Sequence, residues 1–145
     1  MSNLGLKILY GILNERADTY AERAYCPWPD MEAVMRSGGD LLCSLETHTP
    51  LRQFDAVGIS LQYEMTYTNI LTMLDLGGIP LLAADRFGHD PLVIGGGPCA
   101  FNPEPVADFF DCFVIGEGEE IIGEIAAVIA EWKQSGRAGG RPEVL

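Results

Sequence analysis

The chain has 145 residues, of which 48% are hydrophobic and 21% are charged, a composition typical of a folded globular domain. Its formal net charge is −12 and it contains only nine lysines and arginines, which excludes a nucleic-acid surface, because neutralising phosphates requires clustered positive charge. The N-terminus has no signal-peptide pattern, and no apolar run approaches the roughly 20 residues that cross a bilayer. We therefore expect a cytoplasmic protein without a membrane or nucleic-acid partner.

The N-terminal half of the sequence predicts helices with weak strands between them. Apolar residues from Leu6 to Leu13 recur at the spacing of one helix face, and Ser2 or Asn3 is placed to cap that helix. A second helix begins at Pro29 and is stopped by two glycines. The expected order is a helix over residues 6–13, an exposed strand over 18–26, a helix over 29–37 and a short strand over 41–45.

The second half predicts buried strands that alternate with helices. The runs "FDAVGISL", "PLVIG" and "DCFVIG" are almost continuously apolar, as in a sheet covered on both faces. The clearest helix, "EGEEIIGEIAAVIAEWKQSG", has acids in its first turn and Lys133 in its last, as the helix dipole favours. The expected order is a strand over 54–61, a helix over 67–76, a strand over 91–95, a brief helix over 103–110, a strand over 111–116 and a helix over 117–136. This alternation predicts an α/β fold with a doubly wound, mainly parallel sheet.

Three loops that follow the predicted strands are the best functional signal. They are Ser60–Glu64, Gly95–Pro98 and Gly116–Glu119. Since the carboxyl ends of parallel strands meet at one edge of a sheet, we expect the loops to lie together where such folds bind ligands. The three consecutive glycines of the second loop have no Cβ, which lets the main chain come close to a ligand or to another segment of the protein.

Other residues give no catalytic or metal-binding set. The cysteines, at positions 26, 43, 99 and 112, are too far apart for a CxxC pair, and His48 and His89 stand alone in polar loops. The glycine loop lacks the GK[ST] ending of a phosphate loop, and Glu117 and Glu119 would repel a pyrophosphate. The alternative for these two acids is a tight turn in which they complement a helix dipole. We predict no catalytic residue and no metal ligand in this chain.

Three segments together resemble the N-terminal region of radical S-adenosylmethionine (radical SAM) proteins that carry a cobalamin-binding-type domain. They are "SNLGLKILYGILNER", "GISLQYEMTYTNILTMLDLGGIPLLAADR" and "PLVIGGGPCAFNPEPVADFFDCFVIGEGEE", and the resemblance runs over about residues 2–126. Its most specific part is "GGGP…PEP…D…IGEGEE". The resemblance implies a Rossmann-like domain of cobalamin-binding or flavodoxin-like topology over residues 1–135, followed by a linker over 136–145 toward a radical SAM domain.

The resemblance also implies a cofactor site at the strand ends, because in cobalamin-binding domains these loops cradle the corrin and its nucleotide tail. With the acidic loop that the strand pattern adds, the expected cofactor-binding residues are Asn3, Leu4, Gly5, Ser60, Leu61, Gln62, Gly95, Gly96, Gly97, Pro98, Gly116, Glu117 and Gly118. The family's DxHxxG motif, whose histidine ligates cobalt, is replaced here by Asn3-Leu4-Gly5, and the usual SxL by Ser60-Leu61-Gln62. We therefore expect cobalamin to bind without a histidine from this chain on cobalt.

Two departures from the family concern its catalytic apparatus and its first strand. The CxxxCxxC triad that holds the 4Fe-4S cluster of radical SAM enzymes is missing. The cluster and S-adenosylmethionine therefore belong to the radical SAM domain, and the chain alone is expected to be non-catalytic. Family members begin with an apolar strand, whereas Met1 here directly precedes "SNLG". We expect a sheet without this central strand, which is then split or rearranged, or self-associates through unpaired strand edges.

Two other interpretations stay open. In the first, the same loops pack against the radical SAM domain with no cofactor between them, and the chain is a scaffold or interaction domain. In the second, the chain is a stand-alone nucleotide or flavin binder of flavodoxin topology. The second is disfavoured because the sequence has no phosphate-binding loop and the strand ends carry acids.

Overall fold

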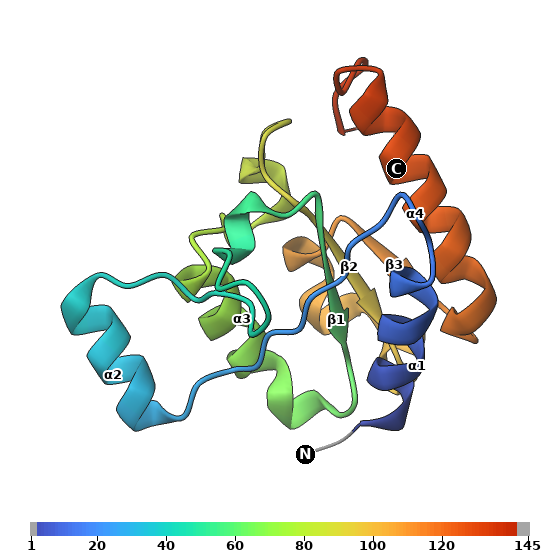
Figure 1. Ribbon diagram of the computed structural model, residues 1–145. Coiled ribbons are helices and arrows are strands. Elements are labelled where there is room, and N and C mark those ends of the chain that lie inside the picture. The colour runs from blue at the N-terminus through green and yellow to red at the C-terminus, as the bar shows by residue number, and fades with distance from the viewer. Residues whose placement is uncertain (1–2, 142–145) are drawn as a thin grey trace.

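The computed structural model describes residues 3–141 as helices arranged around a single small sheet (Figure 1). Short 3₁₀ turns connect the main elements. These elements are α1 (Leu4–Asn14), α2 (Pro29–Gly38), β1 (Ala56–Ser60), α3 (Tyr67–Leu76), β2 (Leu92–Gly96), β3 (Cys112–Val114) and α4 (Gly118–Gln134). Within this part of the chain, every helix is too short or too polar to span a bilayer.

The three strands are parallel and lie in the order β1-β2-β3. Ala56 pairs with Leu92, Ser60 pairs with Gly96, and β3 joins the sheet opposite the end of β2. Helix α3 covers one face of the sheet, while α4, with α1 packed against it, covers the other (Figure 1). The predicted α/β fold with a doubly wound parallel sheet is confirmed.

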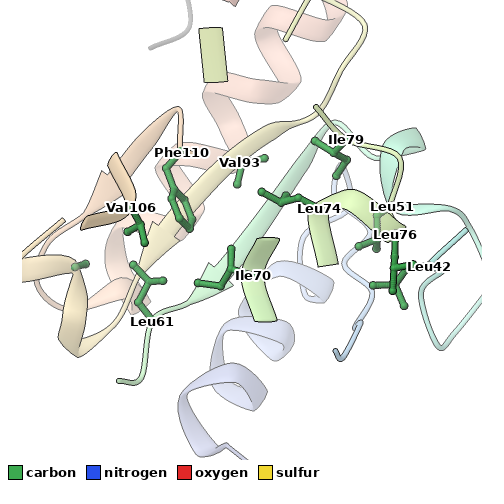
Figure 2. Packing of buried hydrophobic residues seen from close by; sticks show 11 residues of the cluster. Leu42, Leu51, Leu61, Ile70, Leu74, Leu76, Ile79, Val93, Val106 and Phe110 are labelled. Carbon is green, nitrogen blue, oxygen red and sulfur yellow. The ribbon is translucent and has the colours of Figure 1, made fainter. Parts of the chain in front are cut away.

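Alternate residues of the central strand β2 serve two hydrophobic cores. Val93, which is fully buried, packs toward Leu74 of α3 in the larger core (Figure 2). Leu92 and Ile94 face the opposite side, where they contact Trp132 of α4. Burying an aliphatic side chain of this size stabilises a fold by about 1.5–3 kcal/mol. The near-continuous apolar run in the sequence thus reflects a strand buried on both faces.

The short strand predicted over residues 41–45 is wrong. This segment forms only an isolated bridge between Cys43 and Pro50. The reason is that the Leu42 N–H donates to the carbonyl of Leu76 at 2.8 Å, so the segment closes the end of α3 instead of joining the sheet. Side-chain burial of Leu42 explains its apolar character without a strand.

The exposed strand predicted over residues 18–26 is also wrong, because side chains satisfy part of the backbone there. The Asn14 side chain bonds both the N–H and the carbonyl of Ala21, and the Arg23 N–H donates to a carboxylate oxygen of Glu46. The brief helix predicted over 103–110 is present as a 3₁₀ helix, Glu104–Phe109.

The sheet is continuous, so the split or rearranged sheet expected from a missing central strand is absent from residues 3–141. Instead β1 pairs only with β2 and forms an edge of the sheet. Self-association through strand edges stays a prediction.

Candidate functional site

The loops that the sequence singles out gather at one edge of the sheet, which we call the carboxyl edge. The parallel strands end there in Ser60–Gln62, Gly95–Pro98 and Gly116–Gly118. Helix α1 reaches the same edge, because Leu9 lies against Gly118 at the start of α4 and α1 begins beyond that contact (Figure 1). The structure therefore brings all the expected site segments to the carboxyl edge, including the one around Asn3.

The three consecutive glycines have three different environments. A Cβ on Gly95 would lie only 2.7 Å from the Phe113 ring, so this glycine permits close packing inside the protein. Gly97 has a φ of 99°, which favours glycine, and a Cβ there would lie 3.1 Å from the carbonyl oxygen of Leu61. A Cβ on Gly96 would lie 3.9 Å from the nearest atoms, which belong to Val114. Only Gly96 is free of an internal packing constraint.

The segment after β1 combines a buried anchor with exposed polar groups. Leu61 is fully buried, its N–H donates to Gly96 at 2.7 Å, and its carbonyl accepts from Cys99 at 3.0 Å. These bonds fix the glycine loop to the end of β1. The exposed side chains of Ser60 and Gln62 are hydrogen-bonded to each other, with the Gln62 amide donating to the Ser60 hydroxyl. Leu61 thus contributes to the edge through its backbone, and its neighbours contribute side chains.

Two helices begin at the carboxyl edge with different caps. In α1 the side chain of Asn3 accepts a hydrogen bond from Leu6 N–H at 3.2 Å, as predicted for a capping residue. In α4 the capping residue Glu117 makes no side-chain cap bond, and Glu119 and Glu120 occupy the first turn. These acids complement the dipole of α4 and oppose the binding of an anion there. The edge therefore suits uncharged groups better than phosphates.

A tyrosine hydroxyl beside the glycine loop has no hydrogen-bond partner among the described residues. Tyr67 is the first residue of α3, and its buried hydroxyl lies next to Cys99. Burial raises the pKa of Tyr67 above its usual value, and Cys99 adds to this effect. The sequence did not mark Tyr67 as a residue near the candidate site, because its spacing with neighbouring apolar residues indicates only one face of a helix.

Large apolar side chains project into solvent around the carboxyl edge. They come from the start of α1, the turns after β1 and β2, and the residue that follows β3. They are Leu4, Tyr63, Met65, Phe101 and Ile115, with exposed fractions of 71%, 54%, 84%, 71% and 60%. We call these five residues the apolar rim. Apolar side chains that form a contiguous exposed patch are typical of binding sites for a ligand or a protein.

The described residues contain no cluster of three or more side chains that are suited to hold a metal ion. His89 lies in the loop directly before β2, on the amino side of the strands, and His48 lies in the segment that precedes the 3₁₀ helix Leu51–Gln53 and β1. Neither histidine is placed to ligate a metal in a cofactor at the carboxyl edge.

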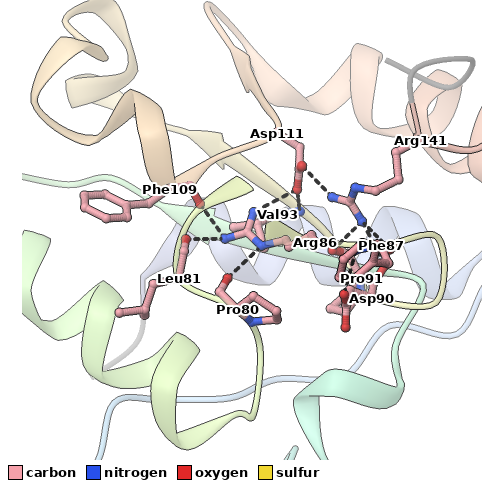
Figure 3. A network of polar contacts seen from close by, with 10 residues as sticks. All are labelled: Pro80, Leu81, Arg86, Phe87, Asp90, Pro91, Val93, Phe109, Asp111 and Arg141. Carbon is pink, nitrogen blue, oxygen red and sulfur yellow. Dashed lines mark hydrogen bonds and ion pairs between the residues drawn. The ribbon is translucent and has the colours of Figure 1, made fainter. Parts of the chain in front are cut away.

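The opposite end of the sheet, the amino edge, carries a buried ion network that sequence reasoning missed (Figure 3). Asp111, just before β3, pairs with Arg86 at 2.9 Å and with Arg141, and it also accepts the Val93 N–H at 2.7 Å. The side chains of Arg86 and Asp111 are 0% and 3% exposed. Burial lowers the pKa of Arg86 below its usual value, and the charge of Asp111 opposes that shift.

The guanidinium groups in this network are also bonded to main-chain carbonyls. Arg86 donates to Pro80, Leu81 and Phe109, and Arg141 donates to Asp90 at 3.0 Å. Every contact is internal, so we interpret the network as structural. An aspartate directly before a strand, with arginines far away in sequence, gave no signal that could have identified it.

A second ion cluster fastens the end of α4 to the same amino edge. Asp55, just before β1, pairs with Lys133 at 2.7 Å and with Arg137 at 2.9 Å. The guanidinium of Arg137 also lies 5.0 Å from the centre of the Trp132 ring. The region that the sequence assigned to a linker over 136–145 therefore includes two arginines that bind the sheet.

Comparisons with known proteins match the chain to a protein family. The profile of the family described as "Radical SAM proteins, N-terminal" matches residues 5–145. The protein MJ0966 of Methanocaldococcus jannaschii, described as uncharacterized, is 36% identical over 78 residues, which are 52% of this chain and 16% of that protein. The chain thus matches only a small part of the relative's length. No solved structure matches the chain significantly. Since the family profile covers nearly the whole sequence, the chain belongs to the family of N-terminal domains of radical SAM proteins.

Proposed function

We propose that this domain holds cobalamin at its carboxyl edge for a radical SAM domain of the same protein, and that it is non-catalytic alone. Family membership implies the neighbouring domain, which would carry the 4Fe-4S cluster and bind S-adenosylmethionine. The observation that carries the cofactor proposal is Gly96. It is the one of the three consecutive glycines at which an added Cβ would make only an ordinary van der Waals contact, 3.9 Å from Val114, at the point where the strand ends converge.

The chemistry of the carboxyl edge fits a large amphipathic ring better than a nucleotide. The exposed hydroxyl of Ser60 and the amide of Gln62 match the amide groups around a corrin, while Leu4 and Ile115 of the apolar rim match its apolar surface. Glu119 and Glu120 disfavour the binding of a free phosphate. When bound, cobalamin supplies a carbon-transfer centre for the radical chemistry of the neighbouring domain. The residues of this chain bind and orient it.

The histidines support a mode of binding without protein ligation of cobalt. Both His48 and His89 precede strands, and Asn3-Leu4-Gly5 occupies the carboxyl-edge position at which the related motif has a histidine. The residues of this chain would then hold the cofactor through its periphery and supply no ligand to its metal.

The cofactor proposal is tested by titrating the 145-residue chain with hydroxocobalamin, followed by visible spectroscopy and calorimetry. We expect saturable binding that Gly96→Val weakens by at least about tenfold, because the new side chain would project into the proposed site. Gly88→Val is the matched control, since a Cβ at Gly88 meets no atom within 4 Å and Gly88 lies before β2, at the amino edge. An absence of binding by the folded wild-type chain, or equal loss in both variants, would contradict the proposal.

The apolar rim favours a second candidate, a scaffold that docks the radical SAM domain directly. This candidate is favoured by Met65 and Phe101 of the apolar rim, whose side chains are 84% and 71% exposed. A radical SAM domain from the same family, supplied as a separate chain, would then bind without cobalamin. We expect Met65→Ser with Phe101→Ser to weaken this binding, measured by calorimetry, without changing the thermal stability of the domain. Binding that requires added hydroxocobalamin would instead favour the cofactor role.

A further inference from the structure

One buried hydroxyl at the carboxyl edge is not explained by the fold. Three buried side-chain nitrogen or oxygen atoms have no hydrogen-bond partner among the described residues, and they belong to Tyr67, Trp132 and Arg141. The Arg141 nitrogen lies against the carboxylate of Asp111 at the amino edge. Trp132 lies near the end of α4, with the guanidinium of Arg137 over its ring. The Tyr67 hydroxyl is the one of the three that lies near the glycine loop.

The position of this hydroxyl follows from the segments around it. Tyr67 is the first residue of α3, and its half-buried ring packs against the larger core. The hydroxyl lies next to the side chain of Cys99, in the turn Pro98–Phe101 at the end of the glycine loop. The Cys99 N–H donates to the carbonyl of Leu61 at 3.0 Å, which ties this turn to the segment after β1. The hydroxyl is therefore enclosed where the loops after β1 and β2 meet.

An unpaired hydroxyl lowers the stability of a folded protein, because it loses its hydrogen bonds to water on burial. A phenylalanine at position 67 would fill the same space in the core without this cost. A buried polar group without a partner therefore calls for an explanation, either in function or in a bound water molecule. Tyr67 lies at the edge where the proposed cofactor binds, so a ligand is a candidate partner.

The surroundings of the hydroxyl select the kind of group that it can bind. Burial, with smaller contributions from Cys99 and Glu64, raises the pKa of Tyr67, so the phenol is protonated at neutral pH and donates. The carboxylate of Glu64, in the turn before α3, disfavours an anionic acceptor, as do the acids in the first turn of α4. An uncharged acceptor such as an amide carbonyl fits these conditions.

We propose that Tyr67 is a ligand-binding residue of the carboxyl edge, and that its hydroxyl donates a hydrogen bond to an amide carbonyl at the periphery of the corrin. The half-buried Cys99 side chain beside the hydroxyl can turn aside for this carbonyl without breaking the backbone bond to Leu61. The same hydroxyl then costs stability in the free domain and adds affinity in the complex. The inference rests on the proposed function, because the amide is a substituent of cobalamin.

Tyr67→Phe tests the inference through two quantities that should move in opposite directions. In the free 145-residue chain it should raise the midpoint of urea unfolding by about 0.5 M, because an unpaired polar group is removed and the ring stays in place. In a calorimetric titration with hydroxocobalamin it should raise the dissociation constant about tenfold. Tyr20→Phe is the matched control, since Tyr20 is 69% exposed and lies beyond the end of α1, and it should change neither quantity.

Aquocobinamide, which keeps the ring amides of cobalamin but lacks the nucleotide tail, identifies the acceptor. Tyr67→Phe should weaken its binding by the same factor of about ten. A loss confined to hydroxocobalamin would overturn the assignment to a ring amide.

The outcomes separate this inference from the proposed function. Binding of hydroxocobalamin that Tyr67→Phe leaves unchanged overturns the role of Tyr67, while the cofactor proposal stands. An unchanged or lower urea midpoint overturns that role too, because the hydroxyl would then have a partner, such as a buried water, in the free domain. A folded wild-type chain that binds neither corrin overturns both proposals.

Discussion

Gly95 and Gly96 are neighbours in the sequence, yet only the structure separates their roles. From composition and position, both read as bare backbone made for close approach. The side chain that Gly95 lacks would overlap the Phe113 ring, whereas a Cβ on Gly96 would lie 3.9 Å from Val114, an ordinary contact. The sequence therefore located the loop correctly but had no means to show which glycine serves packing, because Phe113 belongs to a different strand.

This difference predicts unequal costs for the same substitution. Gly95→Ala should destabilise the domain by about 1–3 kcal/mol, because the inserted methyl forces Phe113 to move in a packed core. Gly96→Ala should change stability by less than about 1 kcal/mol. Urea unfolding followed by circular dichroism measures both free energies. Equal losses would mean that the end of β2 is not packed as described.

Replacing the buried carboxylate of Asp111 should lower the free energy of unfolding by more than either glycine substitution does. Asp111→Asn leaves Arg86 and Arg141 without their counter-charge and should cost about 3–5 kcal/mol, as expected when one partner of a buried ion pair is removed. Asp18→Asn is the control, since the pair between Arg16 and Asp18 is largely exposed, and its unfolding midpoint should stay at the wild-type value.

Among the elements, those with a strong period or a near-continuous apolar run were predictable from sequence, and those held by single hydrogen bonds were not. β1, β2 and α4 follow the predicted positions closely, because their apolar residues face cores that exist in any fold of this class. The segment around Leu42 has the composition of a strand, but its N–H bonds to the end of α3. That choice depends on tertiary contacts that local sequence does not encode.

Helix α1 gives a prediction about the local stability of its first turn. None of its residues is fully buried, so its first turn depends on the Asn3 cap more than on packing. Asn3→Ala should destabilise that turn by about 1 kcal/mol and speed amide exchange of Leu6 by about fivefold. Asn3→Ser keeps a capping oxygen and should restore slow exchange. Identical exchange in all three proteins, measured by NMR, would show that the cap is dispensable.

Over the whole molecule, the network at the amino edge fixes the segment that follows α4. Arg141 reaches from this segment to Asp111, so ion pairs and hydrogen bonds join the three strands and the last helix at one end of the sheet. We expect Arg141→Gln to release the segment and to speed trypsin cleavage after Arg137 about tenfold, which corresponds to a local loss of about 1.4 kcal/mol.

The control for this prediction is Arg36→Gln, which removes an exposed arginine from α2 and should leave cleavage after Arg137 unchanged. Cleavage of wild type at the same rate as Arg141→Gln would contradict the role of Arg141 in holding the segment. Mass spectrometry of the fragments identifies the bond that is cut.

The position of Arg141 at the amino edge decides how the domain can be handled in experiments. Its last described residue is held on the side of the sheet opposite the carboxyl edge, while Asn3 lies at the carboxyl edge itself. A purification tag, a fluorophore or a surface linker attached after Leu145 should therefore leave the glycine loop accessible. The same addition before Met1 would crowd the loop and reduce the measured affinity for ligands, and should be cleaved off before any titration.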